Sequence, residues 1–226
     1  SLVVGAASLA PLVAPAGPFQ GDPAIAYLLP PSLAHPLGTD TQGRDVLTRV
    51  IYGARISLAV GIISQVVASL LGVTLGLISG YYGRRVDALI MRLADVTLAF
   101  PTLLLLIAVA AAVNPSLPVV FVVIGVVGWA GMARLVRGQV LVLKGAEYVL
   151  AARALGAPDR RILFRHLLPN VRAQVIVAAT LGMAGAIMAE AALSFVGLGA
   201  QPPTPSWGSM VADGRDLLRV APWVSF

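Results

Sequence analysis

The feature that most constrains this chain is the length of its uncharged runs. Between Arg55 and Arg84 lie 28 residues without a charge, and Val96 to Ala133 gives 38 more. A helix needs about 20 mainly apolar residues to cross roughly 30 Å of hydrocarbon. With 58% hydrophobic and 12% charged residues, the chain has more apolar side chain than one soluble core of 226 residues can bury. Because the runs are continuous rather than alternating, they favour membrane helices over a β-barrel.

We therefore expect an all-α membrane protein with about six transmembrane helices, the first and last truncated. A turn signal at 114–118 divides the longer run into two spans. Pro101 should kink the first of these or mark its junction with an amphipathic lead-in helix at 86–98. Complete spans are expected within a core domain (56–220), at 56–82, 93–113, 118–137 and 173–195. Parts of two more are expected at 1–14 and 221–226.

Three glycines in the first complete span share one face. Gly72, Gly76 and Gly80 repeat at four-residue spacing, which would let a neighbouring helix approach closely. Glycine is also simply common in membrane helices, so the spacing leaves both explanations open.

The basic residues indicate an orientation. Of the 16 lysines and arginines, the eleven at 84–92 and 134–172 fall on one side of the membrane and five fall opposite. The positive-inside rule then places 140–170 in the cytoplasm and 15–55 and 196–220 outside. The arginines gather at the ends of apolar runs and form no basic stripe, so nucleic acid is not an expected partner.

The outward segments are expected to differ in structure. Segment 15–55 begins with a proline-rich irregular part and ends in a short interfacial helix at 45–55. In the loop 196–220, Trp207 is a candidate anchor at the level of the lipid headgroups. Either segment could also dock a partner protein.

The long polar interruption at 147–170, here called the elbow, lies in a cytoplasmic loop expected at 144–170. Residues 147–155 are good helix formers, Gly156 can cap that helix and Pro158 can open the next at its first position. Two short helices with a bend are predicted. Small side chains and arginines suit contact with a protein or with lipid phosphates, although a loop that only holds orientation remains an alternative.

The elbow resembles the coupling loop of ABC importer permeases. Ala151-Ala152 is followed by three residues and Gly156, then by nine residues and His166-Leu167-Leu168-Pro169. The stretches 35–46 and 190–199 resemble the C-type subunits of dipeptide, oligopeptide and nickel permeases. The resemblance covers roughly 35–220, with separated motifs in the same order.

The resemblance implies a type I ABC importer permease that moves di- or oligopeptides across a bacterial or archaeal plasma membrane. Its partners would be two ATP-binding cassette ATPases, a second homologous permease and an extracytoplasmic solute-binding protein. ATP and Mg²⁺ would bind to the ATPases. Nickel, glutathione or another small solute is the alternative cargo. The implied coupling residues are Glu147, Leu150, Ala151, Ala152, Leu155, Gly156, Ala157, Pro158, Asp159, Arg165, His166 and Pro169.

One coupling position departs from the family pattern. Leu150 stands where the family has glutamate, so the chain lacks a carboxylate there. Glu147 lies three residues earlier, and residues at i and i+3 share a helix face. We hypothesise that Glu147 partly replaces the missing group.

No nucleotide, metal or catalytic site is predicted in this chain. Its single lysine, Lys144, precedes Gly145, whereas a P-loop ends in Gly-Lys-Ser/Thr. The two histidines, His35 and His166, are expected on opposite sides of the membrane and cannot share a metal. An intramembrane enzyme is therefore disfavoured, and a passive channel is the better rival from another class.

Polar residues in the spans are candidates for the translocation path. Glu190 and Asp95 are expected to pair structurally, Asp95 with Arg92. Clusters of acids or bases that could read the termini of a peptide are not visible, which suits selectivity in a separate binding protein. The remaining path candidates are Gln65, Thr97, Gln139, Gln174, Thr180, Met183 and Met188.

Overall fold

The computed structural model describes residues 5, 10, 14, 17–113, 116–201 and 203–224. The regular elements of this described part are helices, accompanied by two isolated antiparallel β-bridges that pair Gly21 with Arg44 and Thr39 with Asp45. The chain forms two compact units. Unit 1 comprises Ser1–Gly61, Val109–Val120 and Ile187–Phe226, and unit 2 comprises Ile62–Ala108 and Phe121–Ala186.

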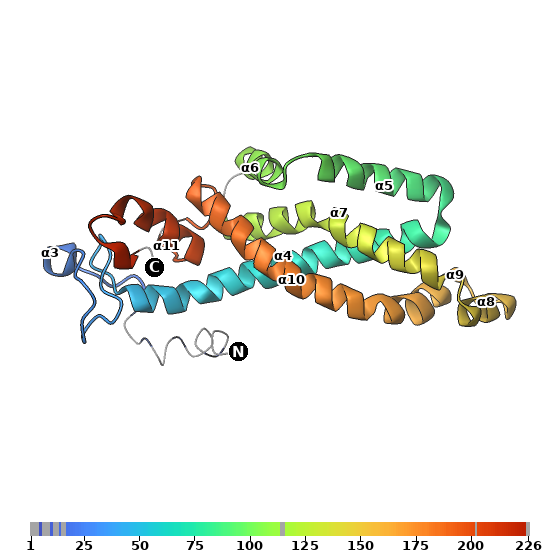
Figure 1. Cartoon of the computed structure of the whole chain (residues 1–226), viewed down its shortest axis with the longest axis horizontal. Coiled ribbons are helices and arrows are strands. Elements are labelled where there is room, and N and C mark those ends of the chain that lie inside the picture. The colour runs from blue at the N-terminus through green and yellow to red at the C-terminus, as the bar shows by residue number, and fades with distance from the viewer. Residues whose placement is uncertain are drawn as a thin grey trace. The chain divides into compact units, whose positions relative to one another are not determined.

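Figure 1 labels the main helices along the chain. Their bounds are α3 (Pro23–Ala26), α4 (Val46–Tyr82), α5 (Arg84–Ala99), α6 (Thr102–Ala112), α7 (Leu117–Leu143), α8 (Glu147–Ala154), α9 (Asp159–Arg161), the π-helix η1 (Ile162–Leu167), α10 (Leu168–Phe195), α11 (Trp207–Gly214), and the 3₁₀ turns η2 (Arg215–Leu217) and η3 (Pro222–Val224).

Three helices of the described part are long and apolar enough to cross a membrane: α4, α7 and the continuous run Asp159–Phe195. The bent pair α5 and α6 makes a fourth if it is one span. Six were expected. The expected first span, 1–14, lies almost wholly outside the described residues. Of the turn expected at 114–118, residues 114–115 also lie outside them, and Leu117 is already the first residue of α7. Of the expected last span, 221–226, residues 222–224 form only the 3₁₀ turn η3 and 225–226 are outside the description.

Two expected boundaries are corrected by the helices. The interfacial helix at 45–55 and the span at 56–82 are one helix, α4, because no residue between them prevents the backbone from continuing. The expected span at 93–113 is instead divided between α5 and α6, which meet at 94°. The break lies at Phe100 and Pro101, since proline has no N–H to donate to the preceding turn.

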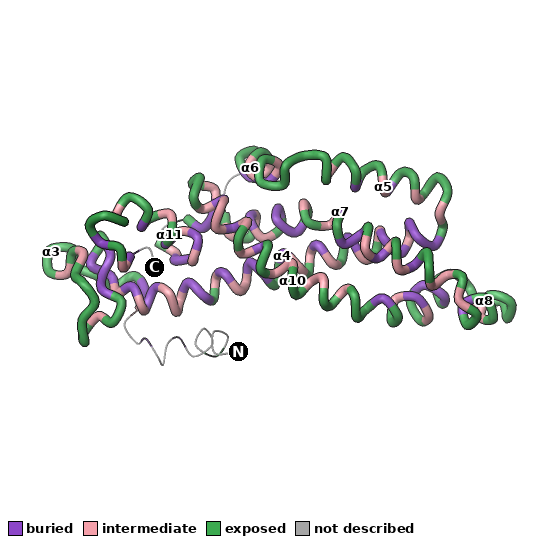
Figure 2. The backbone as a smooth tube through the Cα atoms, in the orientation of Figure 1, coloured by how far each residue is buried: buried purple, intermediate pink, exposed green. Residues whose placement is uncertain are grey.

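In unit 2, the glycine face of α4 packs against α7. A β-carbon added at Gly76 would lie 2.6 Å from the carbonyl oxygen of Ala133, and one at Gly80 would lie 2.8 Å from the Val140 side chain. Gly72 is equally close to α7, at Met132. Of the two explanations left open, close helix approach is the one that the structure supports. Figure 2 shows that buried residues recur along α4 and α7.

Helix α5 is mostly exposed and is held to α7 by two acidic residues. Asp87 accepts two hydrogen bonds from Arg137, of 2.5 and 2.6 Å. Asp95 pairs with Arg134. The expected Asp95–Arg92 pair is therefore wrong, because a partner on the adjacent helix presents its guanidinium to the carboxylate.

In unit 1, Glu190 is fully buried and pairs structurally, as expected. Its carboxylate accepts from the hydroxyls of Ser194 (2.7 Å) and Ser206 (2.9 Å). The neighbouring Trp207 packs on α4, where its indole N–H donates to the Val50 carbonyl (3.1 Å). These bonds fix the start of α11 to the start of α4 within this unit.

Candidate functional site

The elbow begins with α8, which has favourable charges at both ends. Glu147 lies in its first turn and Arg153 in its last, each complementing the helix dipole. The helix ends at Gly156, whose φ of +77° suits glycine. The amide of Gly156 donates to the Arg153 carbonyl and that of Ala157 to the Ala152 carbonyl, at 3.0 and 3.1 Å. This is a Schellman cap, so the prediction that Gly156 caps the helix is confirmed.

The second half of the elbow differs from the prediction. Pro158 is the N-cap of α9 rather than its first helical residue. Helix α9 continues through η1 into α10 without a separating loop. A second free-standing short helix is therefore wrong. The π-helix η1 lies within the elbow, directly before α10, and adds a residue to the helical turn there. Such turns recur at functional sites.

The inner face of the elbow belongs to the core of unit 2. Val149 of α8 and Ile162 and Leu167 of η1 are fully buried. They join one apolar cluster with Tyr81 of α4 and residues of α7 such as Val140. The elbow therefore packs through this apolar face against the ends of α4 and α7.

Polar contacts connect the elbow to the end of α4. The Tyr81 hydroxyl donates to Asp159 (2.6 Å), and the Arg153 guanidinium lies over the Tyr81 ring, 5.5 Å from its centroid. Just before the elbow, the ammonium group of Lys144 donates to the Gly80 carbonyl (3.0 Å), one of the acceptors left unpaired at the end of α4. The elbow is thus tied to α4 by both burial and hydrogen bonds.

The outer face of the elbow is exposed and partly apolar. Leu155 is 88% exposed and Leu150 is 48% exposed, and the aromatic residues Tyr148 and Phe164 of the elbow are exposed as well. The carboxylate of Glu147 is also exposed and makes no side-chain bond to another described residue. Large apolar side chains held outward on a buried base are typical of a protein-binding surface.

The remaining predicted coupling residues are spread over this region. His166 is half buried, with its ring 6.4 Å from that of Tyr148. Ala152 and Ala157 are half buried. The exposed members are Ala151, Pro158, Asp159, Arg165 and Pro169.

Only some of the predicted path residues come together. A groove of about 410 Å³ in unit 2 is lined by Gln65, Thr180 and Met183. The Gln65 amide lies against Gly182, where an added β-carbon would be 2.5 Å away. The groove does not include the other four predicted residues: Thr97, Gln139, Gln174 and Met188. Thr97 instead donates to the Leu93 carbonyl of its own helix, at 2.9 Å.

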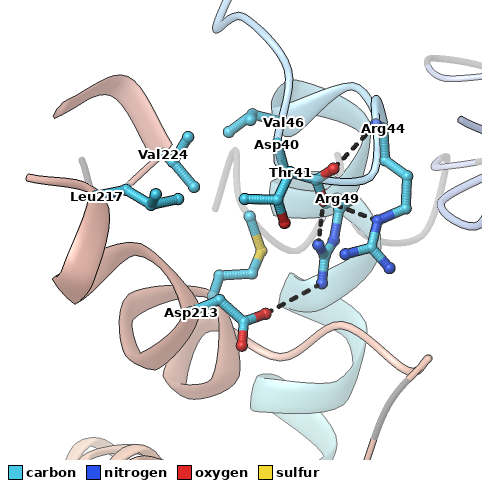
Figure 3. Close-up of a pocket in the computed structure, with 9 residues that line it drawn as sticks. Asp40, Thr41, Arg44, Val46, Arg49, Asp213, Leu217 and Val224 are labelled. Carbon is cyan, nitrogen blue, oxygen red and sulfur yellow. Dashed lines mark hydrogen bonds and ion pairs between the residues drawn. The ribbon is translucent and has the colours of Figure 1, made fainter. Parts of the chain in front are cut away.

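Sequence reasoning missed a charged cluster in unit 1. Asp40 is 4% exposed and accepts hydrogen bonds from two buried arginines, Arg44 (2.7 Å) and Arg49. Arg49 also lies 3.8 Å from Asp213 of α11. Figure 3 shows both guanidinium groups beside Asp40, with Arg49 alone linked to Asp213. The i, i+4 spacing of Asp40 and Arg44 was a visible signal, but the role of Asp213 was not.

The hydrogen bonds around Asp40 keep it ionised. Burial alone would raise the pKa of Asp40, but the bonds from Arg44, from Arg49 and from the Gln42 amide outweigh it and hold the pKa below its usual value. A cavity of about 370 Å³ opens beside this cluster, lined by both arginines and Asp213. The expectation that clusters of acids or bases are absent is therefore wrong for this unit.

Comparison with known proteins gives close relatives. A dipeptide transport system permease protein of Alkalihalophilus pseudofirmus is 50% identical over 193 residues, which are 85% of this chain and 64% of the relative. A glutathione transport system permease protein of Pectobacterium atrosepticum is 46% identical (86% and 65%). An oligopeptide transport system permease protein of Bacillus subtilis is 45% identical (87% and 65%). The chain spans less than two thirds of the length of these relatives.

The family comparison agrees with the helices. Residues 72–224 match the model of the family described as "Binding-protein-dependent transport system inner membrane component". This region holds the bent pair α5 and α6, α7, the elbow and α10. The chain is thus a multi-pass membrane protein of the type I ABC permease fold, and it belongs to the family of binding-protein-dependent transport system inner membrane components.

Proposed function

We propose that this chain is the transmembrane permease subunit of an ATP-driven importer of di- and oligopeptides. The names of the relatives, which describe dipeptide, oligopeptide and glutathione transport, support this class of cargo. Glutathione is itself a small peptide, so one permease chemistry fits all three names. Nickel import, a passive channel and an intramembrane enzyme have no comparable support in these names.

The observation that carries the proposal is the two-sided elbow. Its inner residues Val149 and Ile162 are fully buried, while Leu155 on its outer side is 88% exposed. A partner that grips the outer side can therefore move the elbow as one piece with the ends of α4 and α10. We assign that partner to two cytoplasmic ATP-binding cassette subunits, which bind ATP and Mg²⁺, so residues 140–170 face the cytoplasm.

Two further partners complete the proposed complex. One permease chain with three or four membrane-spanning helices in its described part is too small to enclose a path for a peptide, so a second, homologous permease is proposed. An extracytoplasmic solute-binding protein would deliver the peptide. Alternating access then follows when ATP-driven closure of the ATPases displaces the elbows.

A cysteine experiment tests the proposal directly, because the chain contains no cysteine of its own. A single cysteine at Leu155 should cross-link to an ATPase subunit in native membranes and be shielded from a membrane-impermeant thiol reagent added outside cells. A cysteine at Leu33, which is fully exposed in unit 1, is the matched control and should not capture the ATPase. Labelling of the Leu155 position from outside would refute the proposal.

Transport itself gives the second test. Proteoliposomes that contain the permease pair, the ATPases and the binding protein should accumulate a labelled dipeptide only with ATP. A Leu155→Asp variant should reduce uptake strongly, because a charge on the gripped surface must be desolvated. ATP-independent passage of the dipeptide through the permease alone would favour the channel.

A further inference from the structure

The charged cluster of unit 1 has more buried positive than buried negative charge. Arg44 and Arg49 are 8% and 5% exposed, and the only buried carboxylate among their described partners is Asp40. Asp213 is a weak counterion, because its side chain is 60% exposed and lies 3.8 Å from Arg49. The Nε of Arg49 is buried without a hydrogen-bond partner in the described part. Buried guanidinium groups that share one carboxylate attract a further anion.

Arg44 offers the donors for such an anion. Its Nε donates to Asp40, whereas its two terminal nitrogens make no hydrogen bond to another described residue. In Figure 3 these nitrogens extend away from Asp40. Asp40 fixes the plane of the guanidinium, which leaves a pair of N–H donors in the geometry that a carboxylate accepts.

The adjoining cavity has the size and lining for the end of a short peptide. It measures about 370 Å³ and is lined by Arg44, Arg49, Thr41, Thr204, Gln201 and Asp213. Cavities of about 300–1,000 Å³ are usual for small ligands. The side-chain hydroxyls of Thr41 and Thr204 make no hydrogen bond within the described part of the chain and are available to peptide groups.

We propose that this cavity binds the carboxylate end of a small solute on the Arg44 guanidinium, with Asp213 as a competing internal anion. That the solute is a peptide rests on the proposed function, whereas recognition of the carboxylate rests on the arginine cluster alone. Arg49 and Asp213, which meet here, are 164 positions apart, so the sequence gives no sign that Asp213 belongs to the site.

The first experiment compares two probes that differ only in the carboxylate. Radiolabelled N-acetyl-L-alanyl-L-alanine and its C-terminal amide are equilibrated with the detergent-solubilised chain, without ATP or partner subunits. The acid should bind about tenfold tighter than the amide, as expected for one charge-assisted hydrogen-bonded pair. Equal binding of the two probes, or binding of neither, overturns the proposal.

Two variants give opposite predictions, so a folding defect cannot imitate the result. Arg44→Gln should weaken binding of the acid about tenfold and leave the amide unchanged. Asp213→Asn should tighten binding of the acid about threefold, because it removes the competing negative charge. Asp216→Asn is the matched control, since Asp216 is 80% exposed on the side chain and pairs only with Arg215 in the described part. An unchanged or weaker affinity in Asp213→Asn contradicts the site even if Arg44→Gln fails to fold.

The binding and uptake results separate the two proposals. Discrimination between acid and amide without ATP-driven uptake in proteoliposomes would leave the carboxylate site standing and remove the importer function. ATP-driven uptake of the dipeptide without discrimination between acid and amide would support the importer function and overturn the carboxylate site.

Discussion

The Tyr81 hydroxyl donates a 2.6 Å hydrogen bond to the carboxylate of Asp159, which joins the last turn of α4 to the first residue of α9. The Arg153 guanidinium, from α8, lies over the same ring. One tyrosine thus contacts both halves of the elbow. A force applied to the elbow would therefore reach α4 through this side chain, and α10 through the continuous helix Asp159–Phe195.

Replacing Tyr81 with phenylalanine should loosen this connection. The variant loses the hydrogen bond to Asp159 but keeps the ring, so the free energy of unfolding should fall by only about 1 kcal/mol. Uptake per ATP hydrolysed should fall although the variant stays folded, because the elbow is then held to α4 by fewer contacts. Tyr82→Phe is the control, since Tyr82 is exposed and its hydroxyl bonds to no described residue. An unchanged uptake-to-hydrolysis ratio in Tyr81→Phe would show that the bond transmits nothing.

The close approach of α4 and α7 should be sensitive to a single methyl group. In Gly76→Ala, the new β-carbon meets the backbone of Ala133 at 2.6 Å, so the helices must separate. We expect a loss of about 1–3 kcal/mol in detergent unfolding. Gly131→Ala in α7, where a β-carbon meets nothing within 4 Å, should cause no loss. Equal stability of the two variants would contradict the packing.

Lowering the pH should destabilise unit 1, because the Asp40 carboxylate becomes protonated. Its folded-state pKa lies below the usual value, so this carboxylate stabilises the fold fully above the unfolded-state pKa of about 3.9 and loses that contribution as the pH falls through the folded-state pKa. Asp40→Asn should cost about 3–5 kcal/mol at pH 7, because it leaves two buried arginines without their shared partner.

Denaturant unfolding at pH 7 and at pH 3 checks this account. The difference in unfolding free energy between the two pH values should be smaller in Asp40→Asn than in the wild type. The exposed Asp216→Asn should keep the wild-type difference. If Asp40→Asn kept the wild-type difference in unfolding free energy between pH 7 and pH 3, other carboxylates would be responsible for the acid sensitivity.

Gly156 should tolerate substitution only at a conformational cost. A β-carbon there meets nothing within 4 Å, but φ is +77°, which L-residues with side chains avoid. Gly156→Ala should therefore cost about 1–2 kcal/mol, and Gly156→Asn should cost less because asparagine adopts this region more readily. Thermal unfolding of both variants gives the order, and a more stable Gly156→Ala would mean that the cap changes conformation.

A variant at Glu147 tests the hypothesis that this carboxylate partly replaces the glutamate that the family has at position 150. Both side chains are exposed on α8, where either can reach a partner. Glu147→Ala should lower ATP-driven uptake while leaving the unfolding free energy within about 0.5 kcal/mol. Restoring a glutamate in the double variant with Leu150→Glu should recover uptake. Wild-type hydrolysis and uptake in the single variant would end the hypothesis.

The long apolar helices and the first half of the elbow followed from local sequence. Runs of uncharged residues determine membrane-spanning helices because no other backbone arrangement satisfies its hydrogen bonds in lipid. Pro101 breaks a helix and Gly156 caps one through backbone properties that need no neighbours. The prediction of a second short helix after Pro158 was wrong, because a residue that opens a helix gives no information on where that helix ends.

Tertiary structure alone decided which residues meet across the chain. Asp95 pairs with Arg134 rather than with Arg92, and Tyr81 finds Asp159, because packed helices bring distant charges nearer than neighbours on the same helix. The same holds for Arg49 and Asp213 in unit 1. Sequence determined the helices through local backbone chemistry, and the fold determined the sites, since electrostatic and hydrogen-bonding contacts depend on distance in space and not on separation along the chain.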